Sequence, residues 1–258
     1  MSDLVAPAFA LPRVSTPRAV LFDAYGTLFD VYSVAELAEA LFPGQGQVLS
    51  VLWRDKQIEY TRLVTTCNHG AHYQPFSELT RAALVFAIKK IVDGAYPERA
   101  TGQFFVNFGA QIEQLLAQYQ RLKAFPENLA VLQALKRHGI ATGILSNGDS
   151  AMLHAAVQSA GLTGLLAHVV SVDAVRRFKT HPEAYALGEK ALGLPAPEIL
   201  FVSSNAWDAL GATWHGYTTL WVNRYHLPFE ELGIQPTRTG TSLGDVLDFF
   251  PDLSVSIS

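Results

Sequence analysis

Residues 19–30, AVLFDAYGTLFD, place a carboxylate at the end of an apolar run. Ala19 to Phe22 form a pattern typical of a buried strand, Asp23 follows directly, and Thr27 comes four residues later. A carboxylate at the end of a strand is a candidate nucleophile for covalent catalysis. We therefore take Asp23 as the first candidate catalytic residue.

Polar side chains also follow the later apolar runs of the chain. In open α/β sheets ligands bind beyond the carboxyl ends of the strands, so these side chains are expected to meet at one rim. Each has a plain structural explanation, because Ser, Thr and Asp also cap turns and helices. Four separate polar strand ends nevertheless favour one shared site, which contains Asp23, Thr27, Ser146, Asn147, Lys179, Ser203, Asn205 and Asp208.

Five short apolar runs supply the strands that position these residues. The runs are nearly continuous rather than alternating, which is typical of strands covered on both faces and hence of a parallel sheet. Helical patterns separate several of them, at 126–139, 149–162 and 181–194. This alternation predicts an α/β fold with a doubly wound, Rossmann-like parallel sheet, whose strands lie within 18–26, 140–149, 167–175, 197–208 and 217–224.

The interval between the first two strands is far longer than one crossover requires. Amphipathic helical segments occur in it near 33–42, 47–66, 77–93 and 103–123. We predict a helical cap domain inserted after the first strand and lying over the ends of the core strands. The predicted organisation is an N-terminal arm at 1–17, a core at 18–31 and 121–258 that ends in a short helix and a tail, and a cap at 32–120.

The composition is that of a globular enzyme. Of 258 residues, 49% are hydrophobic and 16% are charged. The net charge of −4, without a long basic run, argues against a nucleic-acid partner. A single cysteine, Cys67, excludes an internal disulfide and fits a reducing compartment. The eight histidines show no metal-ligand spacing, so we expect no metal and no cofactor.

The chain also carries no signal for a membrane or for export. No stretch approaches the roughly 18 consecutive apolar residues of a membrane helix. The first residues, MSDLVAPAFALPRVSTPR, lack the basic start and apolar stretch of a signal peptide. We therefore expect a cytoplasmic protein that has no membrane partner.

The candidate residues lie in motifs that resemble those of the haloacid dehalogenase superfamily, and within it the L-2-haloacid dehalogenases. FDAYGTLFD resembles the first motif, with Asp23 in the nucleophile position, and ILSNGD resembles the second. RRFKTHPEAY resembles the third motif and FVSSNAWD the fourth, and WRDKQIEYT (53–61) resembles a segment of the family's cap. The resemblance runs from about residue 18 to about residue 225, with Thr180 standing where the family often has a proline.

Tyr25 distinguishes the reaction types within this superfamily. Phosphatases of the superfamily generally carry a second Asp two residues after the nucleophile, which protonates the alcohol leaving group. A halide departs unprotonated, so an enzyme that releases halide does not need that acid. Their fourth motif also adds acidic residues that hold Mg²⁺, whereas here it reads Ser-Ser-Asn, with Asp208 alone acidic. Both departures favour metal-free chemistry on carbon.

The resemblance implies an SN2 attack by Asp23 on C2 of a short L-2-haloalkanoic acid. Water then hydrolyses the aspartyl ester, and halide and a D-2-hydroxy acid are the products. Lys179 is expected to keep Asp23 ionised and oriented. Arg54 is expected to meet the halide or to help bind the substrate carboxylate, its alternative being a surface arginine on a helix. Asp208 or Asn205 is expected to position the water, with Asp208 as the preferred base.

The remaining candidates bind the substrate or support the catalytic residues. Ser146 and the backbone N–H groups of Asn147 and Gly148 are expected to open a helix and bind the substrate carboxylate. Thr27 and Ser203 are expected to hydrogen-bond Asp23 or Lys179. The halide pocket is expected to include Tyr73 or Phe76. An apolar wall around the nucleophile and an outer support complete the predicted substrate-binding set, with Tyr25, Ile58 and Trp207 in the wall and Tyr185 as the support.

Two other functions fit the same residues. One is a Mg²⁺-dependent phosphatase of the same fold that acts on a small phosphate ester. The other is a catalytically silent protein that binds a small carboxylate. The resemblance further implies a homodimer, and the expected partners are a small 2-halocarboxylate, water and the halide product.

Overall fold

A computed structural model describes residues 16–95 and 108–251 of the chain. Within them six strands form one parallel sheet in the order β3-β2-β1-β4-β5-β6. This confirms the predicted α/β fold with a parallel sheet. The strands are β1 (Ala19–Phe22), β2 (Ala141–Ser146), β3 (His168–Ser171), β4 (Ile199–Ser203), β5 (Thr218–Val222) and β6 (Arg238–Gly240).

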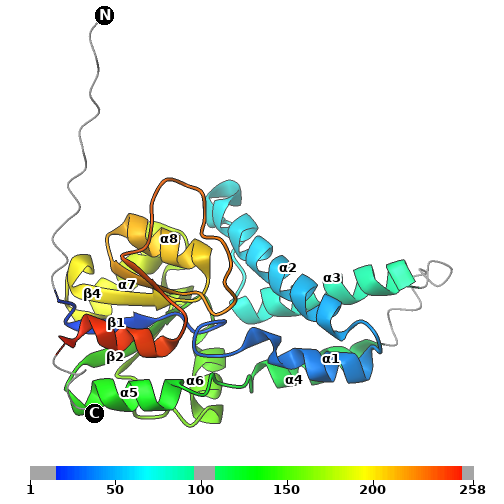
Figure 1. Cartoon of the computed structure of the whole chain (residues 1–258). Coiled ribbons are helices and arrows are strands. Elements are labelled where there is room, and N and C mark those ends of the chain that lie inside the picture. The colour runs from blue at the N-terminus through cyan, green and yellow to red at the C-terminus, as the bar shows by residue number, and fades with distance from the viewer. Residues whose placement is uncertain (1–15, 96–107, 252–258) are drawn as a thin grey trace, which may run out of the picture.

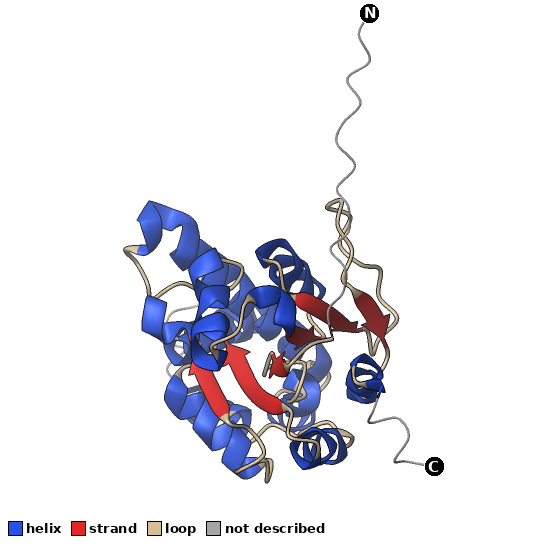
Figure 2. Ribbon diagram, turned by 90° about the vertical axis from the view of Figure 1, so that its left-hand side faces the viewer, coloured by secondary structure: helices blue, strands red, loops and turns tan. Residues whose placement is uncertain are grey.

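The central strands are buried over their whole length. All residues of β1, β4 and β5 are buried, because helices cover the sheet on both faces (Figures 1 and 2). In Figure 1, α7 and α8 lie on one side of the sheet and α5 on the other. These helices and their neighbour are α5 (Asn128–Arg137), α6 (Ser150–Ser159), α7 (Pro182–Leu192) and α8 (Ala206–His215).

The helices of the core begin and end where their sequence signals stand. Asp149 caps α6 by accepting a hydrogen bond from Met152 N at 3.1 Å. Pro182 opens α7, and the helix ends at Gly193 in the left-handed region (φ 64°). The first turns of α6 and α8 thus lie just past the carboxyl ends of β2 and β4, where the candidate site residues are.

Helices α1 to α4 lie between β1 and β2 in the sequence and extend to one side of the sheet (Figure 1). We call the described residues 31–95 and 108–122 the helical insertion. Its helices match the predicted segments closely, although the predicted residues 103–107 lie outside the described ranges, as do residues 1–15 of the predicted arm. The helices are α1 (Ala35–Leu41), α2 (Gly46–Thr66), α3 (Phe76–Ala95) and α4 (Gly109–Tyr119).

The chain enters and leaves the insertion at one place. Phe29 and Ala124 form an isolated antiparallel bridge. Asp30 N donates to Lys123 O at 2.8 Å, and Phe125 N donates to Leu28 O at 3.2 Å. The two crossings therefore run side by side, directly after the turn that carries Asp23 and Thr27.

The C-terminal part differs from the prediction in two ways. The edge strand β6 was not predicted, because its residues Arg-Thr-Gly have no apolar pattern. The predicted last helix is a 3₁₀ helix, η7 (Leu243–Phe249), which begins with a capping box formed by Ser242 and Asp245. Across the described ranges, none of the helices combines the length and the apolar character that crossing a bilayer demands.

Candidate active site

Asp23 follows β1 directly, and three donors hold its side chain. Oδ1 accepts a hydrogen bond from Lys179 Nζ at 3.1 Å. Oδ2 accepts from Thr27 Oγ1 at 3.1 Å and from Asn205 Nδ2 at 2.8 Å. Because the carboxylate is only 8% exposed, these donors replace the water that it loses on burial. The arrangement suits an ionised nucleophile with a fixed orientation.

Lys179 lies between two carboxylates. Its buried Nζ is 3.1 Å from Asp23 Oδ1 and 3.0 Å from Asp208 Oδ2. Its backbone N–H donates to Asn147 Oδ1 at 2.9 Å, so a residue just after β2 fixes the backbone that carries the ammonium. The peptide bond between Lys179 and Thr180 is cis.

Asp208 lies in the first turn of α8 and is completely buried. Its Oδ1 accepts a hydrogen bond from Tyr185 OH at 2.8 Å, which is the support predicted for Tyr185. Burial raises the pKa of Asp208 to about 6, and the nearby Asp23 adds to the rise while Lys179 and Tyr185 oppose it. The site thus contains a carboxyl group that changes its protonation state close to neutral pH.

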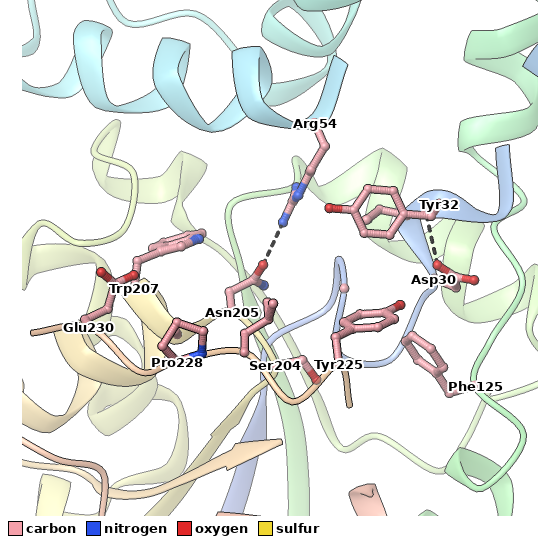
Figure 3. A pocket seen from close by; sticks show the side chains of 14 residues that line it. Asp30, Tyr32, Arg54, Phe125, Ser204, Asn205, Trp207, Tyr225, Pro228 and Glu230 are labelled. Carbon is pink, nitrogen blue, oxygen red and sulfur yellow. Dashed lines mark hydrogen bonds between the residues drawn. The ribbon is translucent and has the colours of Figure 1, made fainter. Parts of the chain in front are cut away.

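Arg54 is a buried residue of α2, so its alternative as a surface arginine is wrong. Its Nη2 donates to Tyr25 O at 3.0 Å. The same nitrogen donates to Asn205 Oδ1 at 3.2 Å (Figure 3). Its Nη1 donates to Gln57 Oε1 at 2.8 Å. Because Asn205 Nδ2 also bonds Asp23, this asparagine links the arginine of the insertion to the nucleophile of the core.

The cavity next to Asp23 is very small. Its volume of about 10 Å³ is enough for about one water molecule. The predicted wall residues line it, and of the two aromatic candidates it is lined by Phe76, whereas Tyr73 bonds Asp173 instead. The lining residues are Asp23, Tyr25, Arg54, Ile58, Thr61, Phe76, Ser146, Asn147 and Trp207.

A larger pocket of about 370 Å³ adjoins this cavity. Figure 3 shows Arg54 reaching down from α2 toward Asn205, with Trp207 and Tyr225 also around the pocket. Arg54 and Trp207 line both spaces, and Asn205 lines the larger one. The side chains of Arg54 and Trp207 therefore lie between the cavity of the nucleophile and the larger pocket.

Two predicted contacts are wrong. Ser203 makes no hydrogen bond to Asp23 or Lys179 within the described residues; its hydroxyl accepts the backbone N–H of Asn205 at 3.1 Å. The backbone N–H of Gly148 is engaged as well, donating to Ser146 Oγ at 3.2 Å, and α6 begins only at Ser150. Gly148 has a packing role instead, since a Cβ there would lie 2.7 Å from Cε2 of Tyr25.

The sequence reasoning missed two polar residues of α2. Gln57 is buried and accepts hydrogen bonds from Arg54 Nη1 and from Tyr119 OH at 3.1 Å. Thr61 lines the cavity beside Asp23. Both lie on the same face of α2 as Arg54, three and seven residues further along the chain. Helical spacing from Arg54 is therefore the sequence signal that could have identified them.

The family model of haloacid dehalogenase-like hydrolases matches residues 17–216. The chain is 42% identical to haloacetate dehalogenase H-2 of Moraxella sp. (strain B), covering 86% of this chain and 92% of the relative. It is 42% identical to the (S)-2-haloacid dehalogenase of Pseudomonas sp. (strain YL), covering 90% and 94%. The chain belongs to the L-2-haloacid dehalogenase family. It is a hydrolase of the carbon–halide class, as the resemblance implied.

Solved structures of L-2-haloacid dehalogenases share the fold. One crystal structure is 51% identical, with a TM-score of 0.83, and covers 91% of this chain and 99% of its own. The L-2-haloacid dehalogenase from Xanthobacter autotrophicus with chloropropionic acid covalently bound is 33% identical, with a TM-score of 0.78 and coverage of 94% and 100%. Covalent attachment of a substrate-like acid is thus on record for a relative.

Proposed function

We propose that this L-2-haloacid dehalogenase converts short L-2-haloalkanoic acids to D-2-hydroxy acids through an ester of Asp23, without a metal ion. The observation that carries the proposal is the setting of Asp23. Its carboxylate is held by Lys179, Thr27 and Asn205 and faces a small cavity with Tyr25, Ile58, Phe76 and Trp207 in its wall. Poor access of water leaves the carboxylate weakly hydrated and therefore more reactive.

In the first step an oxygen of Asp23 forms a bond to C2 while the carbon–halogen bond breaks. The halide leaves with the bonding electron pair, and C2 is inverted. Arg54 is the cation on the insertion side of the cavity, and we assign it to the leaving halide. The Ser146 hydroxyl and Asn147 line the same cavity and are assigned to the substrate carboxylate.

In the second step water adds to Cγ of Asp23, and the bond between Cγ and the product oxygen breaks. Asp208 takes one proton of the water and passes it to the departing oxygen, which becomes the hydroxyl group of the product, while the second proton of the water is released to solvent as the Asp23 carboxylate reforms. This step does not touch C2, so the single inversion of the first step is retained. An L-substrate therefore gives a D-product.

Two features of the site support the choice of halide chemistry over a Mg²⁺-dependent phosphatase. The position two residues after Asp23 is a tyrosine whose pKa burial raises well above its ordinary value, so it is a poor proton donor to a leaving alcohol. Asn205 turns its amide nitrogen to Asp23, and Lys179 lies between the two carboxylates. A hard cation prefers oxygen ligands at that place, so these residues fit Mg²⁺ poorly.

The test is a single turnover of L-2-chloropropionate in ¹⁸O-water, followed by mass spectrometry of the peptide that contains Asp23. The proposal expects ¹⁸O in Asp23, chloride release that persists in EDTA, and a D-configured lactate. Label in the product alone would mean direct attack by water and would contradict the ester. The D23N variant is the control and is expected to release no chloride.

The parent protein and the D23N variant also distinguish the two alternative functions. Hydrolysis of a generic phosphate ester that EDTA abolishes would favour the phosphatase. Binding of chloroacetate without chloride release, unchanged in D23N, would favour a silent binding protein.

A further inference from the structure

The helical insertion contacts the core a second time, at the far end of α2. Thr65 lies in the last turn of α2, and the short 3₁₀ turn η2 (Cys67–Gly70) follows. They face residues 173–178, the segment directly before Lys179. We call the residues Thr65, His69, Tyr73, Asp173 and Arg177 the clasp.

Three hydrogen bonds join the two sides of the clasp. Phe178 N donates to Thr65 Oγ1 at 3.1 Å, and Arg177 Nη2 donates to His69 O at 2.5 Å. Tyr73 OH donates to Asp173 Oδ1. Burial and the neighbouring carboxylate raise the pKa of Tyr73 above its ordinary range, so the phenol remains a donor at any working pH.

Aromatic stacking connects the clasp to the Asp23 cavity. The ring of Tyr73 stacks on the buried ring of Phe178, with 5.1 Å between the centroids and 26° between the planes. The Phe178 ring in turn lies 6.2 Å from that of Phe76, which lines the cavity. A shift of Tyr73 is therefore transmitted to the residue before Lys179 through direct contact.

The η2 turn has an unusual backbone that matches this role. Asn68, His69 and Gly70 are successive residues in the left-handed region, with φ of 46°, 52° and 74°. A Cβ at Gly70 would overlap the guanidinium of Arg177. Left-handed non-glycine residues persist where surrounding contacts hold them, and here they bring the His69 carbonyl to Arg177.

We infer that the clasp holds Lys179 in place between Asp23 and Asp208, so that Tyr73, Asp173 and Arg177 are positioning residues for the catalytic ammonium. Lys179 follows Phe178 directly, and its own backbone is held by Asn147 from β2. Contacts from the insertion thus fix one side of this segment and the core fixes the other. The inference rests on the proposed role of Lys179 and adds Tyr73 and Asp173, which lie outside the recognised motifs.

The first test is kinetic. Y73F keeps the ring stack and loses only the donor, whereas D173A loses the acceptor. Each is expected to lower kcat for L-2-chloropropionate about tenfold, the effect of one lost hydrogen bond, with KM within about twofold. Because both remove the same bond, the double variant is expected to be no slower than either single variant. D173N retains an acceptor oxygen and is expected to restore most of the rate.

The second test needs no activity. Acetic anhydride labels exposed amines, and mass spectrometry of the peptide containing Lys179 measures its protection. Y73F and D173A are expected to raise labelling of Lys179 several-fold over the parent protein. If the parent protein released no halide, the proposed function would be wrong, but the labelling would still show whether the clasp holds Lys179 in place.

The matched control is E36Q, which removes the exposed ion pair between Glu36 and Lys123 (3.4 Å) at the other crossing of the insertion. It is expected to leave kcat and Lys179 labelling unchanged. A clasp variant that loses only stability to urea, with kcat within twofold and Lys179 still protected, would overturn the inference. So would a rise in KM at constant kcat, because that pattern places the clasp in substrate binding.

Discussion

At the scale of single residues, the two carboxylates of the site differ in their surroundings. Asp23 accepts hydrogen bonds from three donors and lies at a cavity. Asp208 is completely buried and accepts from Lys179 and Tyr185. These different surroundings suit the two carboxylates to the different roles proposed for them, Asp23 as the nucleophile and Asp208 as the base.

The first prediction concerns pH. Because the pKa of Asp208 is raised to about 6, kcat is expected to fall as the pH decreases through about 6, when the base takes up a proton. Protonated Asp208 is the inactive form, so the enzyme is expected to be active above about pH 6 and to lose activity below it. Steady-state chloride release between pH 4.5 and 8.5 measures it. D208N is expected to be slow and to lack the limb, and a limb that survives in D208N would assign it to another group.

The second prediction concerns Tyr185. Its hydroxyl donates to the Asp208 carboxylate at 2.8 Å and lowers the pKa of that group. Y185F is expected to move the acid limb of kcat upward by about one pH unit, because the charged form loses a donor. Y217F serves as the control, since the Tyr217 hydroxyl bonds the backbone O of Tyr185 and not Asp208. Equal shifts in the two variants would indicate a general loosening.

At the scale of elements, the turn between β2 and α6 supports Tyr25. A Cβ at Gly148 would lie 2.7 Å from Tyr25 Cε2 and 3.0 Å from Leu153 Cδ2. G148A is therefore expected to lower the free energy of unfolding in urea by about 1–3 kcal/mol, the effect of overpacking a core. G109A, in the first turn of α4 with no atom nearby, is the control and is expected to be neutral or stabilising. A fully stable G148A would show that the tyrosine ring moves without cost.

The fold was predictable where burial leaves a mark on the sequence. The central strands have helices on both faces, so their residues form continuous apolar runs that are easily recognised in the sequence. β6 is three residues long and lies at the sheet edge, where Thr219 N and Thr237 Oγ1 also bond at 3.0 Å. An edge strand of Arg-Thr-Gly needs no apolar face, and nothing in its composition distinguishes it from a loop.

The site was predictable in its members and less so in its contacts. Strand order places Asp23, Lys179 and Asp208 at one rim, and a general rule suffices for that. The partner of a hydroxyl or a backbone N–H depends on the backbone angles of its turn. The contacts predicted for Ser203 and Gly148 were therefore wrong. The bonds of Arg54 span from α2 to Tyr25 and Asn205, and they depend on how the insertion packs on the core, which no local spacing encodes.

At the scale of the whole molecule, the helical insertion forms one side of the cavity next to Asp23. Arg54, Ile58 and Thr61 of α2 and Phe76 of α3 form part of its wall. A cavity of about 10 Å³ holds no haloacid. A haloacid therefore needs a larger space beside Asp23 than the one that this structure shows between the insertion and the core.

The fourth prediction tests the attachment of the insertion. R54Q removes the charge that reaches Tyr25 O and Asn205, and kcat is expected to fall about 10²-fold or more, the effect of losing a charge-stabilising donor. R62Q also weakens a contact from α2 to the core, the guanidinium 5.5 Å from the Trp207 ring, but does not reach the cavity. It is expected to change kcat by less than about threefold. Similar losses in both variants would assign the effect to attachment and not to the halide.

The paired crossings at Phe29 and Ala124 have a consequence for the history of such enzymes. Both ends of the insertion meet at one bridge, so the sheet does not depend on what lies between them. A different helical unit joined at Asp30 and Lys123 would leave Asp23, Lys179 and Asp208 in the core, beyond the carboxyl ends of the strands. Exchange of the insertion at this one bridge would therefore change the side of the cavity that contains Arg54 and Phe76, while the core side of the reaction centre is inherited unchanged.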